Sequence, residues 1–224
     1  MSNSKLISST ILSPNNSGKR THAIDRITPH CMVGQMTAKA CGGLFARSSY
    51  QASSNYGIGK DGEIALYVDE GKRSWCSSSE SNDQRAVTIE CASDVKPPYA
   101  MNSKVYASLV RLCVDICQRN GKTKLLWFGD KNKTLNYSPK SDEMILTVHR
   151  WFAQKSCPGD WLYSRLGKLA SEVTTQLSGA PEAPKPDKHY RVMCGSFSSE
   201  ANAEKRVSDL KAAGFDAVIM EVEN

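Results

Sequence analysis

A proline-rich stretch near the end of the chain most constrains what this sequence can fold into. Residues 178–187, SGAPEAPKPD, hold three prolines and almost no side chain that could build a core. Such a composition predicts a semi-extended linker. The linker divides the 224 residues into a first domain, residues 1–177, and a short C-terminal module, residues 188–224. A module of that size can hardly bury a core alone, because small domains hide too little surface.

Charge is distributed unevenly between the two parts. Residues 1–177 hold 23 basic and 15 acidic side chains, whereas residues 178–224 hold 6 and 8. A basic domain suits a polyanionic surface such as nucleic acid or an anionic cell wall. The sequence has no Arg-rich block interleaved with aromatic residues, so nucleic acid is not an expected partner. No apolar stretch approaches the ~20 residues that cross a bilayer, so no membrane partner is expected either.

The N-terminal residues, MSNSKLISSTILSPNNSGKR, do not resemble a secretory signal. They lack a continuous apolar region and a cleavage site of small residues. We therefore expect synthesis in the cytoplasm, with any export by another route. The chain has eight cysteines, and most are expected to be reduced, because a disulfide scaffold is typical of shorter, secreted chains.

Strand and helix patterns alternate along the first domain, which favours a mixed α/β fold. Strands are predicted over residues 22–28, ending at Pro29-His30, over 85–91, expected at the centre of the sheet, and over 125–127. Residues 56–68 predict a hairpin that turns at Asp61-Gly62. Helices are predicted over residues 102–120, stopped by Gly121, and from Pro158 to 177.

Two histidines and a cysteine have the composition of a catalytic zinc site. His30 follows a predicted strand, and Cys157 stands eight positions after His149, just before a predicted helix. Two imidazoles and one thiolate leave a fourth position open for water, whose pKa zinc lowers from 15.7 towards ~7. Taken singly, a histidine or cysteine of this kind is more often structural than a metal ligand. Cys113 and Cys117, four positions apart on a helix, are interpreted as core residues without a metal role.

Three further residues could supply catalytic groups beside these ligands. Lys155 precedes Cys157 by two positions, where its charge could stabilise a developing oxyanion. Glu90 is a lone carboxylate in an apolar strand, so burial should raise its pKa towards that of a useful general base. Tyr56 opens a strand and could place its hydroxyl over a bound carbonyl. A solvent-exposed strand end for Glu90 and ordinary strand packing for Tyr56 are the competing interpretations.

Four motifs in this order resemble the zinc-dependent N-acetylmuramoyl-L-alanine amidases. They are TPHCMVGQ, ASSNYGIGKDG, RAVTIE and HRWFAQKSCPG. The resemblance spans about residues 20–177 and includes amidase-type bacteriophage lysozymes and peptidoglycan recognition proteins. It implies a central mixed β-sheet flanked by helices. It also implies that the zinc ligands are His30, His149 and Cys157.

The same resemblance implies roles for the neighbouring residues. Glu90 matches the catalytic carboxylate of the family, Lys155 its oxyanion-stabilising lysine, and Tyr56 a tyrosine that some members use beside the metal. How Tyr56 and Glu90 divide the work stays open. The complete ligand set argues against a recognition protein that has lost a catalytic ligand.

The C-terminal module resembles the first half of a SPOR domain, a peptidoglycan-binding module. The similarity lies in YRVMCGSFSSEANAEKR and LKAAGFDA, which predict a strand over 188–197, a helix over 199–214 and a strand over 215–222. We expect two copies to pair through strand edges, which would make a homodimer. A partly ordered remnant is the alternative.

Together these features predict a phage-type endolysin that hydrolyses the amide between N-acetylmuramic acid and L-alanine in bacterial peptidoglycan. A Gram-positive wall is the expected partner, reached after holin-type release. The alternatives are a host autolysin or recycling amidase, a non-catalytic peptidoglycan-binding protein and a structural zinc domain, and cobalt or manganese could replace zinc. The hydroxyl-rich segment 75–83 is either a solvated loop or the lining of a substrate groove.

Overall fold

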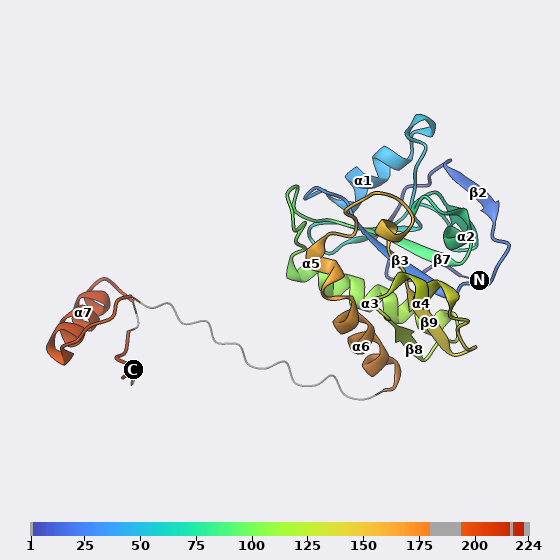
Figure 1. The fold of residues 1–224 in the computed structure, drawn as a ribbon. Coiled ribbons are helices and arrows are strands. Elements are labelled where there is room, and N and C mark those ends of the chain that lie inside the picture. The colour runs from blue at the N-terminus through green and yellow to red at the C-terminus, as the bar shows by residue number, and fades with distance from the viewer. Residues whose placement is uncertain (1, 180–193, 216, 222–224) are drawn as a thin grey trace. The chain divides into compact units, whose positions relative to one another are not determined.

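The structure, a computed structural model, describes residues 2–179, 194–215 and 217–221. It forms two compact units, Met1–Glu182 and Ala183–Asn224 (Figure 1). From residue 180 onwards, the predicted linker lies outside the described residues. In the described part of the chain, no helix is long and apolar enough to cross a membrane.

The first unit is built on a mixed seven-stranded sheet. Its strand order is β1-β5-β4-β7-β3-β9-β8. The strands are β1 (Ser9–Thr10), β3 (Arg26–Cys31), β4 (Tyr56–Ile58), β5 (Ile64–Leu66), β7 (Ala86–Cys91), β8 (Lys124–Leu126) and β9 (Glu143–Leu146). β3 pairs in parallel with β7 and β9, while β4 and β5 form the predicted antiparallel hairpin. A separate two-stranded sheet joins β2 (Asn16–Lys19) to β6 (Lys72–Ser74). The predicted fold class is confirmed.

Helices cover both faces of this sheet (Figure 1). On one face, α3 (Ser103–Arg119) and α6 (Leu166–Leu177) pack over β4, β7 and β8 and enclose the larger apolar core. On the other face, α1 (Ala38–Phe45) packs against β4 and β5. The remaining short helices are η1 (Ser48–Tyr50), α2 (Glu80–Asp83), α4 (Lys131–Asn136), η2 (His149–Trp151) and α5 (Asp160–Tyr163).

The long helix α3 follows its sequence signals closely. The Asn102 side chain caps it by accepting hydrogen bonds from the backbone N–H groups of Lys104 and Val105. Gly121 ends it with a φ of +66°, a conformation in which glycine is unstrained. Cys113 and Cys117 are fully buried on its inner face, which confirms their interpretation as core residues.

Strand β3 runs further than its sequence predicts, through Pro29 and His30 to Cys31. A proline normally breaks a central strand because it has no N–H to donate. Here the backbone groups of Ile27 and Pro29 face β9, but β9 ends at Leu146, opposite Ile27. The missing N–H therefore interrupts no ladder hydrogen bond, and the strand carries His30 into the sheet.

The helix predicted from Pro158 to 177 is two helices, α5 and α6, separated at Ser164–Arg165. The guanidinium of Arg165 lies over the Trp161 ring and donates to the Trp161 carbonyl at 2.9 Å. A side chain thus satisfies a carbonyl that the backbone of a continuous helix would have satisfied. The apolar face survives the break, because Leu162, Leu166 and Leu169 are all buried.

The second unit is described mainly by α7 (Glu200–Ala212), which lies within the predicted helix. The first predicted strand falls largely on residues 188–193, outside the described residues. Residues 194–197 and 217–221 do not form strands. Several apolar side chains of this unit are exposed, among them Phe215 at 64% and Val218 at 84%.

Candidate active site

The pairing of β3 with β7 sets His30 beside Glu90. These two residues are register partners, and so are Pro29 and Ile89. Because side chains alternate along a strand, Ile27 and Ile89 enter the core under α3, while His30 and Glu90 occupy the opposite face. The sheet thus separates the apolar core from the polar face that carries the candidate site.

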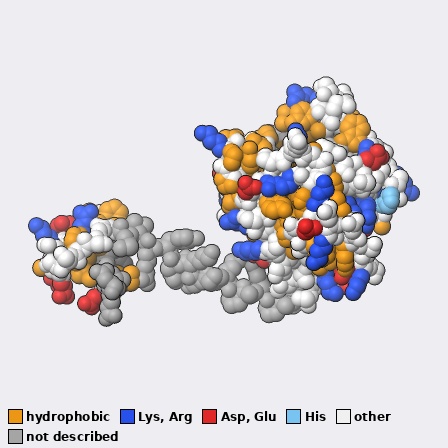
Figure 2. Space-filling model, viewed as in Figure 1, with side chains coloured by type: hydrophobic (Ala, Val, Ile, Leu, Met, Phe, Trp, Pro, Cys, Tyr) orange, Lys and Arg blue, Asp and Glu red, His pale blue; other side chains and the backbone are white. Residues whose placement is uncertain are grey.

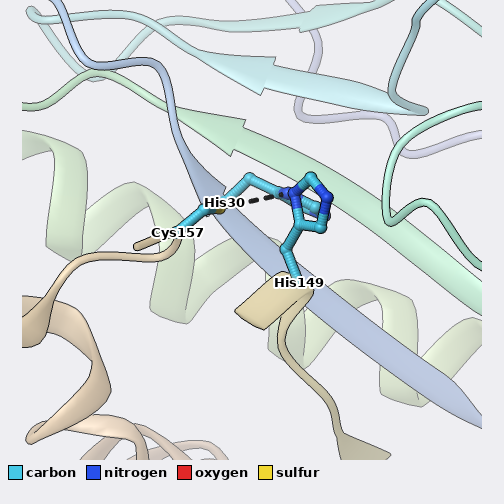
Figure 3. A group of neighbouring side chains, drawn as sticks. All are labelled: His30, His149 and Cys157. Carbon is cyan, nitrogen blue, oxygen red and sulfur yellow. Dashed lines mark hydrogen bonds between the residues drawn. The ribbon is translucent and has the colours of Figure 1, made fainter. Parts of the chain in front are cut away.

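His30, His149 and Cys157 converge from three segments, as Figure 3 shows. His30 comes from β3, His149 begins η2, and Cys157 lies on the loop that follows. The Sγ atom of Cys157 is 3.3 Å from Nδ1 of His30, and the ring centroids of His30 and His149 are 5.1 Å apart. One ligand atom from each residue lies within 4.8 Å of the others. The predicted trio is therefore assembled.

The three donors fit a zinc ion. With Zn–N bonds of about 2.0 Å and Zn–S bonds of about 2.3 Å, tetrahedral coordination separates nitrogen and sulfur by about 3.5 Å, close to the 3.3 Å between His30 and Cys157. Burial and the neighbouring His149 hold the pKa of His30 well below its usual value. Burial, then the charge of Lys155, lowers the pKa of His149 as well. Both imidazoles are thus neutral at pH 7, the form that binds metal.

Lys155 is exposed, yet it lies near enough to His149 for its charge to lower the pKa of that histidine. Glu90 is half-buried, and desolvation raises its pKa from 4.5 to about 7, against the smaller effect of a hydrogen bond from Cys76. Its Oε2 atom is buried without a partner among the described residues. Such a carboxyl can exchange a proton near neutral pH.

A second potential ligand set shares His30 and adds Cys76 and Glu90. The Cys76 Sγ atom donates to Glu90 Oε1 at 3.9 Å. Burial and the Glu90 charge hold the pKa of Cys76 well above its usual value, and a contact with Cys31, followed by burial, raises the pKa of Cys157 as well. The thiol pKa values therefore do not separate the two sets. The set of His30, His149 and Cys157 offers two imidazoles and leaves the Glu90 carboxyl available for proton transfer.

Cys76 and Ser78 are site residues to which the sequence pattern assigned no specific role. Ser78 Oγ lies 2.9 Å from Nε2 of His149, which leaves Nδ1 of that ring for a metal. Ser78 has a φ of +59°, a strained conformation for a residue with a side chain. The buried Asp83 carboxylate holds the loop by accepting from the backbone N–H groups of Cys76 and Ser77. Part of segment 75–83 therefore lines the site, and the hydroxyl-rich composition of this segment was the signal for it in the sequence.

Tyr56 is not at this site, so its predicted position beside the metal is corrected. It pairs with Ile89 rather than Glu90, which turns its side chain to the opposite face of the sheet. Its hydroxyl, fully buried, accepts from the Ser4 N–H and donates to Glu70 at 2.6 Å. Glu70 is paired with Arg119. Tyr56 belongs to a structural polar network, and the sequence pattern missed this because strand parity decides the face.

Comparison with known proteins agrees with this architecture. The family model described as N-acetylmuramoyl-L-alanine amidase matches residues 20–160, and the model of the SPOR domain matches residues 186–224. The structure of PlyL is similar with a TM-score of 0.53 and 12% identity, covering 73% of this chain and 94% of that one. A selenomethionine AmpD derivative is similar with a TM-score of 0.52 and 18% identity, covering 74% and 95%.

No curated protein matches the chain. At such low identities, the two solved structures show the fold alone, which is the amidase-type mixed sheet flanked by helices. The amidase model, however, matches more than half of the sequence. This chain therefore belongs to the N-acetylmuramoyl-L-alanine amidase family and carries a SPOR domain at its C-terminal end.

Proposed function

We propose that this protein hydrolyses the amide between the lactyl group of N-acetylmuramic acid and the L-alanine of the peptidoglycan stem peptide. The observation that carries the proposal is the complete ligand set of His30, His149 and Cys157 with Glu90 on the adjacent strand. A non-catalytic recognition protein needs neither a complete ligand set nor a desolvated carboxyl beside it.

The proposed metal is zinc, and its chemistry would be that of a Lewis acid, which polarises a carbonyl and acidifies water. The remaining steps fall to side chains of this chain. Glu90, with a pKa raised to about 7 by burial, can accept a proton from the attacking water and return it to the leaving amine. The Lys155 ammonium can stabilise the negative charge that develops on the amide oxygen.

The proposed biological role is that of an endolysin. The SPOR domain would bind peptidoglycan and hold the enzyme on the wall, a Gram-positive one in our proposal. Synthesis in the cytoplasm and release through a holin pore complete this proposal. A host autolysin or recycling amidase would perform the same chemistry. A holin gene next to the gene of this protein would favour the endolysin, and its absence would favour the host enzyme.

Purified protein should be incubated with Gram-positive walls while free amino groups and reducing sugars are followed. We expect new N-terminal alanine, no reducing ends, loss of activity with a chelator and recovery with zinc. Wall binding without release of amino groups would instead identify a binding protein. Unfolding on chelation, with no hydrolysis at any stage, would identify a structural zinc site.

A further inference from the structure

A groove of about 520 Å³ adjoins the candidate active site. Ser78, which contacts His149, forms part of its rim. Trp151 and Phe152, next to His149 along the chain, provide an apolar wall. The groove therefore adjoins the ligand set through two separate segments, and apart from Ser78 none of its residues has been given a role at the site.

The groove is lined by an unusual buried cation. Arg26 is only 6% exposed, and its guanidinium donates to the neutral Asn82 side chain at 3.2 Å. Among the described residues, no carboxylate lies within ion-pair distance of Arg26. Burial and the charge of Arg85 lower the pKa of Arg26, against the smaller effect of the Asp25 charge. Buried charges are normally paired, because the loss of hydration is costly, yet the Asp25 carboxylate forms its ion pair with Arg85 and not with Arg26.

Two other cations line the same groove and differ in what they can offer. The donors of Arg85 are occupied by both carboxylate oxygens of Asp25. Lys131, at the start of α4, forms no ion pair with any described residue. The groove lining contains Arg26, Arg85 and Lys131 but no carboxylate, so its net charge is positive, and Arg26 and Lys131 are the cations that no ion pair occupies. Figure 2 shows the wider setting, since basic side chains outnumber acidic ones on the visible face of the first unit.

We propose that this groove is a subsite for a free carboxylate of the stem peptide, bound by Arg26 and Lys131. This inference rests on the proposed function, since the stem peptide is the substrate only if the amide is the scissile bond. The peptide extends from that amide and carries free carboxylates, while the wall formed by Trp151 and Phe152 suits its methyl groups. A carboxylate fits the planar donors of a guanidinium.

The test compares two soluble muropeptides that differ only in whether the stem carboxylates are free or amidated. Lys131→Glu is the test variant, and Lys133→Glu is its matched control. Lys133 lies on the same helix but sits over the Phe128 ring and does not line the groove. Both changes alter the net charge equally and both lie on the exposed side of α4, so the fold should survive each of them.

For the wild-type protein, we expect a lower KM for the free form than for the amidated form. Lys131→Glu should raise the KM for the free form by about threefold to tenfold, as expected for exposed charges, and leave kcat and the amidated form unchanged. Lys133→Glu should change neither KM. The preference of the wild-type protein for the free form should shrink as ionic strength rises.

Equal KM values for the two muropeptides, or equal effects of the two variants, would overturn the subsite while leaving the proposed function intact. Failure of the wild-type protein to release amino termini from either muropeptide would instead overturn the proposed function. A glycerol phosphate oligomer that competes at lower concentration than the free stem peptide would assign the groove to phosphate and also overturn the carboxylate assignment.

Discussion

At the scale of single residues, holding the metal and moving the proton are separable tasks. In the proposed mechanism, Cys157 is a metal ligand, whereas Glu90 moves the proton from the neighbouring strand. We expect Cys157→Ser to reduce both the zinc content and the rate of hydrolysis. We expect Glu90→Gln to reduce the rate of hydrolysis by at least about 10²-fold while the zinc content is unchanged. Metal analysis after dialysis, set beside release of amino groups from walls, checks both. Full activity of either variant contradicts the assignment.

The buried Glu90 carboxyl should also destabilise the folded protein. Its folded pKa of about 7 lies above its ordinary value of 4.5, so the folded state favours the protonated form. In the metal-free protein, its contribution to the free energy of unfolding is therefore intact below about pH 4.5, falls as pH rises, and is lost above pH 7. From 1.36 kcal/mol per pKa unit, the loss is on the order of 3 kcal/mol.

Glu90→Gln should remove this pH dependence. The metal-free variant should be more stable than the wild-type protein at pH 8, and the difference should vanish near pH 4. Urea unfolding at several pH values in the presence of a chelator measures the two curves. Glu80→Gln is the control. It removes an exposed ion pair with Arg73, which contributes at most about 1 kcal/mol, so this variant should keep the pH dependence of the wild-type curve. A stability difference that does not change with pH contradicts the burial argument.

Ser78 should hold His149 in its ligating orientation. Ser78→Gly removes the hydroxyl that contacts Nε2 and tolerates the φ of +59° without strain. Partners of metal-bound histidines typically contribute 10–100-fold to metal affinity, so we expect a loss of about that size. Competition with a chromophoric chelator measures it. Ser81→Ala, which removes the hydroxyl of an exposed neighbour, should leave the affinity unchanged.

The sequence predicts the role of a single residue when a local motif indicates it, but not when the strand register or a distant contact decides it. For His30, His149 and Cys157, residue type alone was not enough, and the resemblance of the surrounding motifs to the amidase family singled out these three residues, which the structure brings together. Tyr56 needed the strand register, and its face follows from its pairing with Ile89. Ser78 needed the conformation of a loop that Asp83 holds, and no local pattern encodes such a long-range contact.

At the scale of elements, the close packing of the sheet on the site face depends on Gly57. This residue pairs with Glu90 across the sheet, and a Cβ placed on it would lie 2.0 Å from the Tyr67 hydroxyl. We expect Gly57→Ala to destabilise the protein by about 1–3 kcal/mol, as overpacking does, and to displace the strand that carries Glu90. The unfolding temperature and the rate of hydrolysis should both decrease.

Gly43 provides the matched control for that change. It lies inside α1, and nothing stands within 4 Å of the place that an added methyl group would occupy. Gly43→Ala should therefore leave activity unchanged and raise stability by up to about 1 kcal/mol, the difference in helix propensity. Equal unfolding temperatures for the two glycine variants would show that the contact with Tyr67 imposes no constraint.

The predicted boundaries of helices and strands were right where local sequence signals set them. They were wrong where contacts with distant residues set them. The Asn102 cap and the Gly121 stop define α3, and the Asp61-Gly62 turn defines the β4–β5 hairpin. By contrast, β3 continues through Pro29 because β9 ends early on that side. The helix break before α6 depends on one side chain, Arg165, that bonds the carbonyl of Trp161. The periodicity of apolar residues predicts neither the early end of β9 nor the contact between Arg165 and Trp161.

At the scale of the whole molecule, the first unit should fold without the second. Its two apolar clusters are composed of residues from Ile7 to Leu177. A protein ending at residue 182 should therefore unfold cooperatively and hydrolyse soluble muropeptides at the rate of the full chain, while binding walls less tightly. Pelleting with walls and a kinetic assay on soluble substrate test the two halves of this prediction. Equal wall binding would show that the SPOR domain contributes no affinity.

The second unit, by contrast, leaves its apolar side chains uncovered. Phe197, Phe215, Val218 and Ile219 are between 47% and 84% exposed, and none of its described residues is buried. Exposed apolar surface of this kind marks an interaction site. We predict that two chains associate through this unit, since burial of these side chains would stabilise both copies.

Sedimentation velocity over a wide concentration range tests this association. The full chain should shift from monomer to dimer as concentration rises, and the protein ending at residue 182 should remain monomeric throughout. Phe215→Ser, which replaces an apolar side chain that is 64% exposed, should move the transition to higher concentration. The tests are independent of catalysis, because the candidate ligands His30, His149 and Cys157 all lie in the first unit. A full chain that stays monomeric at every concentration would leave peptidoglycan as the surface that covers these side chains.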